Sequence, residues 1–196
     1  RVPQIAVVCG NTAGASATIA SMADVRVMTE KAKFSVSPAS VLADNGADKD
    51  TASAKSAYEN GYVDVMCAKD EDAFESVKDI LSFLPSNKLD NNVYTGVEDD
   101  PNRATPEVET LVANENYDAH DLIKSVADGA RFTELGAGKA NAVITAFMTV
   151  NGVVCGVAAN NPAHNGGRLS AGALRKLSAF VNLCNSFGIS VLNLVD

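Results

Sequence analysis

The chain has 196 residues, of which 46% are apolar and 20% are charged, and its formal net charge at pH 7 is -8. The apolar content is sufficient for a hydrophobic core and excludes a disordered chain, and the acidic balance argues against a general nucleic-acid surface, which needs clustered Lys and Arg. The sequence contains no signal peptide and no apolar run long enough to span a bilayer, so we expect a cytoplasmic location.

The first stretch of interest runs from a strand into a helix through two glycines. The apolar run 5–8 indicates a buried strand, and the small residues 15–20 suit a helix. Gly10 and Gly14 lie between them, which would leave backbone N–H groups free at the helix N-terminus. The pattern is compatible with an oxyanion or phosphate cradle, but short glycine patterns often occur by chance, so these residues alone favour an ordinary strand-to-helix turn. It is not a Walker loop, because no Gly-Lys-Ser/Thr follows.

The rest of the first half alternates strands and helices. We predict strands at 24–28, 34–37 and 62–66, a short helix after Pro38, and a helix capped by Asp50 or Thr51 that runs to about Asn60. The amphipathic stretch 70–84 predicts a helix with these side chains inward: Phe74, Val77, Ile80, Leu81 and Leu84. Residues 86–106, with few large apolar side chains, predict an extended linker.

The second half repeats the alternation. We predict a helix from Asp118 or His120 to Asp128, a strand at 132–135, and a hairpin of 141–150 with 153–159, because Asn151-Gly152 favours a type I′ turn. A polar loop at 160–167 precedes a helix from the Ser170 cap to Phe187 and a buried strand at 189–195. The inward side chains predicted for that helix are Leu174, Leu177, Phe180, Val181 and Cys184. Alternation of this kind predicts an α/β fold with helices packed on sheet.

The cysteines are widely spaced and each lies in an apolar segment. No C-x-x-C pair occurs among Cys9, Cys67, Cys155 and Cys184, so we expect no zinc or other metal site and four buried, reduced thiols. The chain begins at Arg1 rather than Met and stops at Asp196 directly after an apolar run, so we expect a piece of a longer polypeptide.

Several segments together resemble one family. Val2-Pro3-Gln4-Ile5 followed by Gly10-x-x-Ala13-Gly14-Ala15 resembles the VPQI…G-x-x-A-G-G segment of biotin-dependent acyl-CoA carboxyltransferases, the family of propionyl-CoA carboxylase β subunits and methylmalonyl-CoA decarboxylase α subunits. Collinear matches cover nearly the whole chain: Phe34-x-x-Ser37-Pro38, Gly61-Tyr62-Val63-Asp64, Leu81-Ser82-Phe83-Leu84-Pro85, Asp100-Pro101-Asn102-Arg103, Phe132-x-Glu134-Leu135, Asn151-Gly152-x-x-x-Gly156-x-x-Ala159-Asn160-Asn161-Pro162 and Lys176-x-x-x-Phe180-Val181-x-x-Cys184.

The resemblance implies an α/β, crotonase-like fold of the ClpP/crotonase superfamily, with parts of two tandem subdomains. Residues 1–90 would form the rear part of the N-terminal subdomain, 91–116 a linker, and 117–196 the front part of the C-terminal subdomain. In the family one subdomain binds the acyl-CoA, and the other binds biotin carried on a biotin carboxyl carrier protein. The active site lies between opposite protomers, so the resemblance implies a homo-oligomer, with membrane contact only indirectly if the parent is a decarboxylase pump.

The resemblance also implies site residues. The backbone N–H groups of Gly14 and Ala15 would form an oxyanion hole, with Gly10 and Ala13 beside it, although Ala15 stands where the family usually has a second glycine. Asn160, Asn161 and Pro162 would line the biotin side, or else form only a turn that ends a strand. Lys176 matches a family lysine, but we expect a solvated helix residue, and neither His120 nor His164 is nominated.

The implied function is transfer of CO₂ between carboxybiotin and an acyl-CoA through an enolate stabilised by backbone donors. Such a reaction needs no acid–base side chain, which fits the absence of a recognisable triad. Two alternatives stay open. One is a non-catalytic crotonase-fold scaffold or CoA-binding subunit. The other is a crotonase-type hydrolase or isomerase, which would need an acid or base near Gly14.

Overall fold

The computed structural model spans residues 1–196 and describes all of them except 47–49, 91–92, 95, 97–98 and 101. The described chain divides into two compact units, Val2–Ser82 and Phe83–Asp196, the second of which includes Arg1. The predicted boundaries 1–90, 91–116 and 117–196 stay a prediction. Each unit is described by itself.

The first unit is built on a parallel sheet. Its strand order is β1-β3-β5, from β1 (Ile5–Val8), β3 (Val25–Thr29) and β5 (Val65–Cys67), with Val7 opposite Val27 and Val27 opposite Val65. The predicted strands at 5–8 and 24–28 are confirmed, whereas β5 is shorter and begins later than predicted. Val25, Val27 and Met28 are fully buried, because parallel strands joined by helical crossovers are covered on both faces.

A second, two-stranded sheet forms where the stretch between Gly10 and Gly14 pairs with a later strand. β2 (Asn11–Ala13) pairs in parallel with β4 (Lys33–Ser35), with Ala13 opposite Ser35. β2 was not predicted, because its three residues are small or polar and carry no recognisable alternation.

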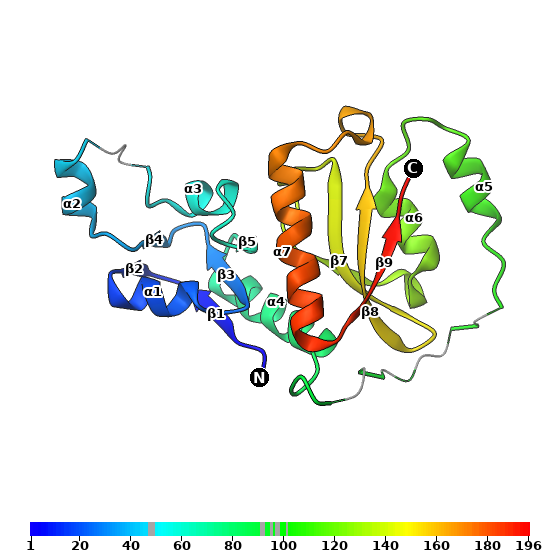
Figure 1. The fold of residues 1–196 in the computed structure, drawn as a ribbon, viewed down its shortest axis with the longest axis horizontal. Helices are drawn as coiled ribbons and strands as arrows, with labels where there is room; N and C mark the ends of the chain where they lie inside the picture. Colours follow the sequence, from blue (N-terminus) through cyan, green and yellow to red (C-terminus); the bar gives the residue numbers. More distant parts are fainter. Residues whose placement is uncertain (47–49, 91–92, 95, 97–98, 101) are drawn as a thin grey trace. The chain divides into compact units, whose positions relative to one another are not determined.

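The helices in the described part of this unit are α1 (Ala15–Ser21), α2 (Ala39–Asp44), α3 (Ala54–Glu59) and α4 (Asp70–Phe83), whose last residue belongs to the second unit (Figure 1). The cap of α3 is Ser53, whose side chain accepts a hydrogen bond from the Ser56 amide, rather than Asp50 or Thr51. The predicted inward face of α4 is only partly right. Ile80 is fully buried, but Phe74 and Leu81 are half exposed.

The second unit contains a mixed sheet in the order β6-β7-β8-β9. Its strands are β6 (Phe132–Glu134), β7 (Val143–Val150), β8 (Val153–Asn160) and β9 (Ser190–Leu194). The predicted hairpin is confirmed: β7 and β8 are antiparallel, and both turn residues, Asn151 and Gly152, have positive φ. β9 is an edge strand whose residues are mostly exposed, so the prediction of a buried strand is wrong.

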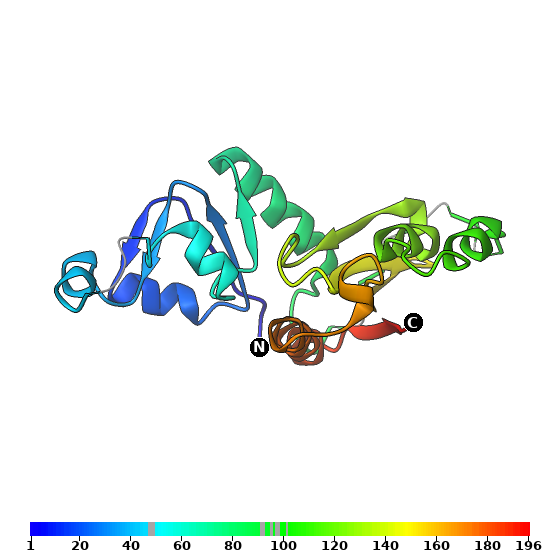
Figure 2. The same ribbon diagram turned by 90° about the horizontal axis from the view of Figure 1, so that it is seen from above.

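Helices cover both faces of this sheet (Figure 2). α6 (Ala119–Val126) packs through Ile123 against a cluster that includes Ile144 and Met148 of β7. The Phe147 ring, on the other face of the strand, lies 5.3 Å from the Phe180 ring of α7 (Ala171–Phe187). β7 is therefore buried on both faces, which explains its continuous apolar sequence. The remaining helical segments are α5 (Pro106–Val112), η1 (Asp128–Ala130) and η2 (Asn165–Gly167).

The ends of α7 agree with the prediction, and its inward face agrees in part, because Phe180 and Cys184 are buried as predicted. Ser170 caps the helix by accepting from the Ala173 amide, and Gly188 ends it in the left-handed conformation. Leu174 and Val181, predicted to point inward, are 52% and 38% exposed, and Lys176 is buried instead. The helix therefore turns a charged residue toward the sheet.

The thiols are free but do not share one environment. Cys67 and Cys184 are buried and Cys155 is partly buried, but Cys9 is exposed because it follows Val8, the last residue of β1. The prediction of four buried thiols is therefore wrong for Cys9.

Contact between α7 and β8 depends on a missing side chain at Gly156. A Cβ there would lie 2.8 Å from Cys184 Sγ and 3.0 Å from the Phe180 ring. We expect Gly156→Ala to lower the free energy of unfolding by about 1–3 kcal/mol through overpacking. Gly172→Ala is the control: it lies in the first turn of α7, its added Cβ would lie 3.6 Å from Ser170 Oγ, and it should be neutral or stabilising. Urea denaturation measures both, and equal effects would contradict this account.

Candidate functional site

The glycine stretch forms a strand–turn–helix in which Gly14 is the N-cap of α1. Gly14 has φ 61° and ψ -131°, a conformation that strains any L side chain. A Cβ on Gly10 or Gly14 would meet no atom within 4 Å. The backbone conformation, rather than the surrounding space, therefore explains the glycine at position 14. Ala13 and Ala15 are both exposed beside it.

The structure changes the predicted donor set at this turn. The Gly14 amide donates within the fold, to the Val36 carbonyl at 3.0 Å and to the Ser35 carbonyl at 3.3 Å. These bonds extend the ladder of β2 and β4 by one residue, so the Gly14 N–H is not free for an anion. Within the described part of the chain, the Ala15 and Ser16 amides have no acceptor, and no side chain caps α1. The donors that this turn offers are therefore Ala15 and Ser16.

The other predicted site residues lie together at the end of β8 and support the fold. The Asn160 side chain binds the Asp196 backbone twice, accepting from its amide at 2.8 Å and donating to its carbonyl at 2.9 Å. Asn161 is fully buried and accepts from the Ala119 amide at 3.1 Å, which makes it a second cap of α6. Pro162 is buried beside it. Their role in substrate binding stays a prediction, and each predicted group lies within its own unit.

Lys176 is the residue for which the expectation was wrong. Its side chain is 4% exposed, and its ammonium donates to Glu134 Oε1 at 3.2 Å and to the carbonyls of Lys139 and Val143 at 3.1 and 3.0 Å. Burial lowers the pKa of Lys176, and the Glu134 carboxylate partly opposes this shift. Gly136 makes room for the lysine, because a Cβ there would lie 2.9 Å from its Cε.

His120 lies between two carboxylates. Its Nδ1 is 2.6 Å from Asp118 Oδ1, and its Nε2 is 2.9 Å from Glu134 Oε2. Burial alone would lower the pKa of His120, but the hydrogen bonds and charges of Glu134 and Asp118 outweigh it, so the pKa is raised. The pKa of Asp118 is lowered, because hydrogen bonds from His120 and Asn161 outweigh the effect of burial.

These groups form one polar chain across the second unit, which we call the Lys176–Asn161 network: Lys176, Glu134, His120, Asp118 and Asn161. It joins α7, β6, α6 and the turn after β8. These residues lie in separate segments of the sequence, and His120 was not predicted to be a site residue. Because the members are spread over nearly sixty positions, only the folded chain shows that they meet.

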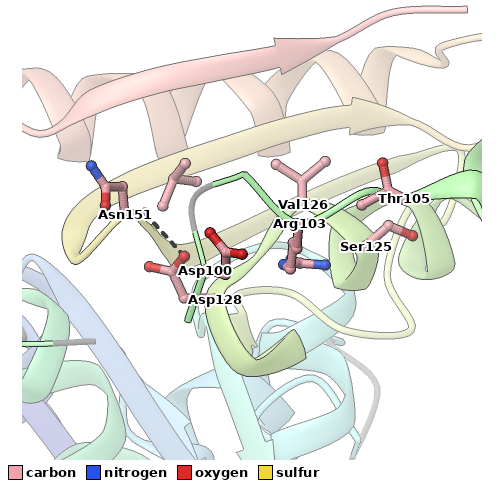
Figure 3. Close-up of a pocket in the computed structure, with 8 residues that line it drawn as sticks. Asp100, Arg103, Thr105, Ser125, Val126, Asp128 and Asn151 are labelled. Atoms are coloured by element: carbon pink, nitrogen blue, oxygen red, sulfur yellow. Dashed lines mark hydrogen bonds between the residues drawn. The ribbon is translucent and has the colours of Figure 1, made fainter. Parts of the chain in front are cut away.

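A pocket of about 220 Å³ opens beside the hairpin turn (Figure 3). Asp128, one of its lining residues, accepts from the Asn151 and Gly152 amides at 3.0 and 2.8 Å. Arg103 donates to the Ala127 carbonyl and pairs with Asp99. The charged side chains of Asp128 and Arg103 in this pocket are thus already bound within the fold, and the pocket contains none of the predicted site residues.

Among the residues that the structure describes, no cluster of three or more His, Cys, Asp or Glu side chains could hold a metal ion. No helix in the same residues combines the length and apolar character needed to cross a membrane.

Comparison with known proteins gives one consistent result. The sequence profile described as carboxyl transferase domain matches residues 1–196. The methylmalonyl-CoA carboxyltransferase 12S subunit of Propionibacterium freudenreichii subsp. shermanii is 32% identical over 203 residues, covering all of this chain and 38% of that protein. The propionyl-CoA carboxylase beta chain of Saccharopolyspora erythraea is 32% identical, covering all of this chain and 39% of that protein.

A solved structure agrees. The transcarboxylase 12S crystal structure, described as a hexamer with hydrolysed methylmalonyl-CoA bound, superposes with a TM-score of 0.92 at 32% identity, over all of this chain and 40% of that chain. The two units thus have the crotonase-like fold expected from the resemblance. The chain spans about two fifths of the length of these relatives.

The buried lysine gives a stability prediction. Lys176→Met leaves Glu134 partly uncompensated, and breaking a buried ion pair costs about 3–5 kcal/mol, so we expect a loss of about 3 kcal/mol. Lys124→Met is the matched control, because Lys124 pairs with Asp121 at the exposed surface of the same unit and such pairs contribute about 0–1 kcal/mol. Urea denaturation compares the two, and similar losses would refute the assigned role of Lys176.

The thiols give a second prediction. Burial raises the pKa of Cys155 to about 11 and that of Cys184 to about 12. Partial burial and the Asp70 carboxylate also raise the pKa of Cys9, but its side chain is exposed to reagent. We expect iodoacetamide near neutral pH to modify Cys9 in the folded chain, and to modify Cys184 only after denaturation, because the thiolate is the nucleophile. Peptide mass spectrometry measures both rates, and modification of folded Cys184 at the rate of Cys9 would contradict the structure.

Proposed function

Because the chain belongs to the carboxyl transferase domain family, we propose that it supplies part of a carboxyltransferase that moves CO₂ between carboxybiotin and an acyl-CoA. The observation that carries this proposal is the agreement over the entire chain with the transcarboxylase 12S structure, at a TM-score of 0.92. Biotin held by a carrier protein would supply the nitrogen that bears the carboxyl group. The carrier, a homo-oligomeric assembly and a cytoplasmic location belong to the same proposal.

The two units would divide this work. We assign the acyl-CoA side to the strand–turn–helix at 10–15 and the biotin side to the turn at 160–162, in parts of two crotonase-like subdomains. Removing a proton from, or CO₂ from, the α-carbon of a thioester places negative charge on its carbonyl oxygen. Preorganised N–H donors stabilise such an oxygen, and the Ala15 amide is available for this task.

A graft tests the activity. This chain would replace the matching 38% of the 12S subunit, and carboxyl transfer from methylmalonyl-CoA to free biotin would be measured. We expect the graft to transfer carboxyl groups. A graft that assembles as the 12S subunit does, binds the CoA thioester and shows no transfer would overturn the proposal and favour a non-catalytic CoA-binding scaffold.

The donor is tested by deleting one N–H group. Ala15→Pro removes the amide hydrogen at the first position of α1, where proline is tolerated. We expect kcat of the graft to fall by about 100- to 1,000-fold, the effect of removing one oxyanion donor. Ala15→Ser keeps the amide and is the control. A proline variant with the kcat of the serine variant would remove Ala15 from the proposed site.

A further inference from the structure

His120 faces an acceptor at each ring nitrogen. Asp118 Oδ1 lies 2.6 Å from Nδ1 and Glu134 Oε2 lies 2.9 Å from Nε2. A carboxylate can only accept, and a neutral imidazole has one N–H to donate. Both contacts are hydrogen bonds only if the ring carries two N–H groups. The geometry therefore requires the imidazolium form, or else a repulsive contact at one nitrogen.

The surrounding charges favour the same form. Lys176 donates to Oε1 of Glu134, the oxygen that His120 does not contact. The two carboxylates, Asp118 and Glu134, are therefore balanced by two cations if the ring is an imidazolium: Lys176 and His120 itself. A neutral ring would leave Asp118 without a cation, and would leave Glu134, whose side chain is only 13% exposed, with Lys176 alone as its cation among these groups. Lys139 lies near Lys176 and adds to the lowering of its pKa, while Lys124 and Asp121 of α6 pair with each other.

The proton on His120 is linked to the turn after β8. Asp118 Oδ1 accepts from His120 Nδ1 and also from Asn161 Nδ2 at 3.1 Å. The Asn161 carbonyl oxygen in turn accepts from the amides of Ala119, at the start of α6, and Ala163. The orientation of Asn161 therefore depends on where Asp118 is held. Two groups of His120 hold it, the ring Nδ1 and the backbone amide, which donates to the same oxygen at 3.0 Å.

We propose that His120 is a positioning residue that stays an imidazolium in the folded protein, and that loss of its proton loosens the turn at 160–162. The part that concerns substrate rests on the function proposed above, because that turn is assigned to the biotin side. The protonation itself rests only on the contacts within this unit.

The sign of the pH dependence follows from the raised pKa. The pKa of His120 lies above its ordinary value of 6.5, so the folded state binds this proton more tightly than the unfolded state does. The contribution to stability is fully present below pH 6.5 and is lost as the pH rises through the folded-state value. Alkaline conditions should therefore weaken the network.

Nuclear magnetic resonance of the 196-residue chain tests the protonation directly. The chain has two histidines, so the exposed His164 is removed by His164→Gln and the signals that survive belong to His120. We expect His120 to titrate above pH 6.5 and both of its ring nitrogens to be protonated below that midpoint. A His120 titration midpoint below pH 6.5, or a neutral His120 ring in the folded chain at pH 6.5, would overturn the proposal.

Stability gives a second readout on the same chain. As the pH rises above 6.5, the free energy of unfolding should fall more steeply in the parent and in His164→Gln than in His120→Gln, because only the first two release this proton. Parallel pH dependence in all three would overturn the proposal. If His120→Gln does not fold, the titration of the unaltered ring still decides the question.

The graft separates positioning from a purely structural role. We expect KM for free biotin to rise with pH above the pKa of His120, by up to about tenfold per pH unit because one proton is involved, with little change in kcat. In His120→Gln this KM should be independent of pH. A flat parent profile in an active graft would overturn the positioning role. A graft without transfer, together with a raised His120 midpoint, would overturn the proposed function and leave the protonated histidine supported.

Discussion

Glu134 is shared by two cations that come from different helices, and the second unit depends on this arrangement. Lys176 reaches it from α7 and His120 reaches it from α6, although these helices lie on opposite faces of the sheet. β6 is the strand that carries Glu134, at the edge of that sheet. An uncompensated charge in such a place is costly, so each of the three side chains requires the others. The network thereby fixes how two helices and a turn approach one strand.

Local signals in the sequence predicted much of this fold. The Asn151–Gly152 hairpin, the Ser170 cap and the Gly188 stop all follow from conformational preferences of single residues, and the structure has each of them. The faces of helices were harder. Leu174 was expected to be buried and is exposed, whereas Lys176 was expected to be exposed and is buried. Apolar periodicity cannot predict this, because Glu134, which binds Lys176, comes near it only after folding.

At the candidate site, too, the sequence predicted the elements but not the contacts that form on folding. The strand, the glycines and the start of α1 were visible in the sequence, but β2 was not. Its pairing with β4 engages the Gly14 amide and shifts the available donors to Ala15 and Ser16. The family resemblance supplied the expected reaction. Only the backbone hydrogen bonds could show which N–H groups the fold leaves for it.

Little chain separates the paired strands β7 and β8 of the second unit, and more separates the strands of the parallel sheet in the first unit. β7 and β8 are joined by a two-residue turn, so their pairing closes a very short loop. β1, β3 and β5 meet only after helical crossovers, and each such closure costs more chain entropy before any contact is gained. The hairpin is therefore suited to act as the folding nucleus of its unit. The parallel sheet is expected to assemble later, and until then its apolar strands are open to association with other chains.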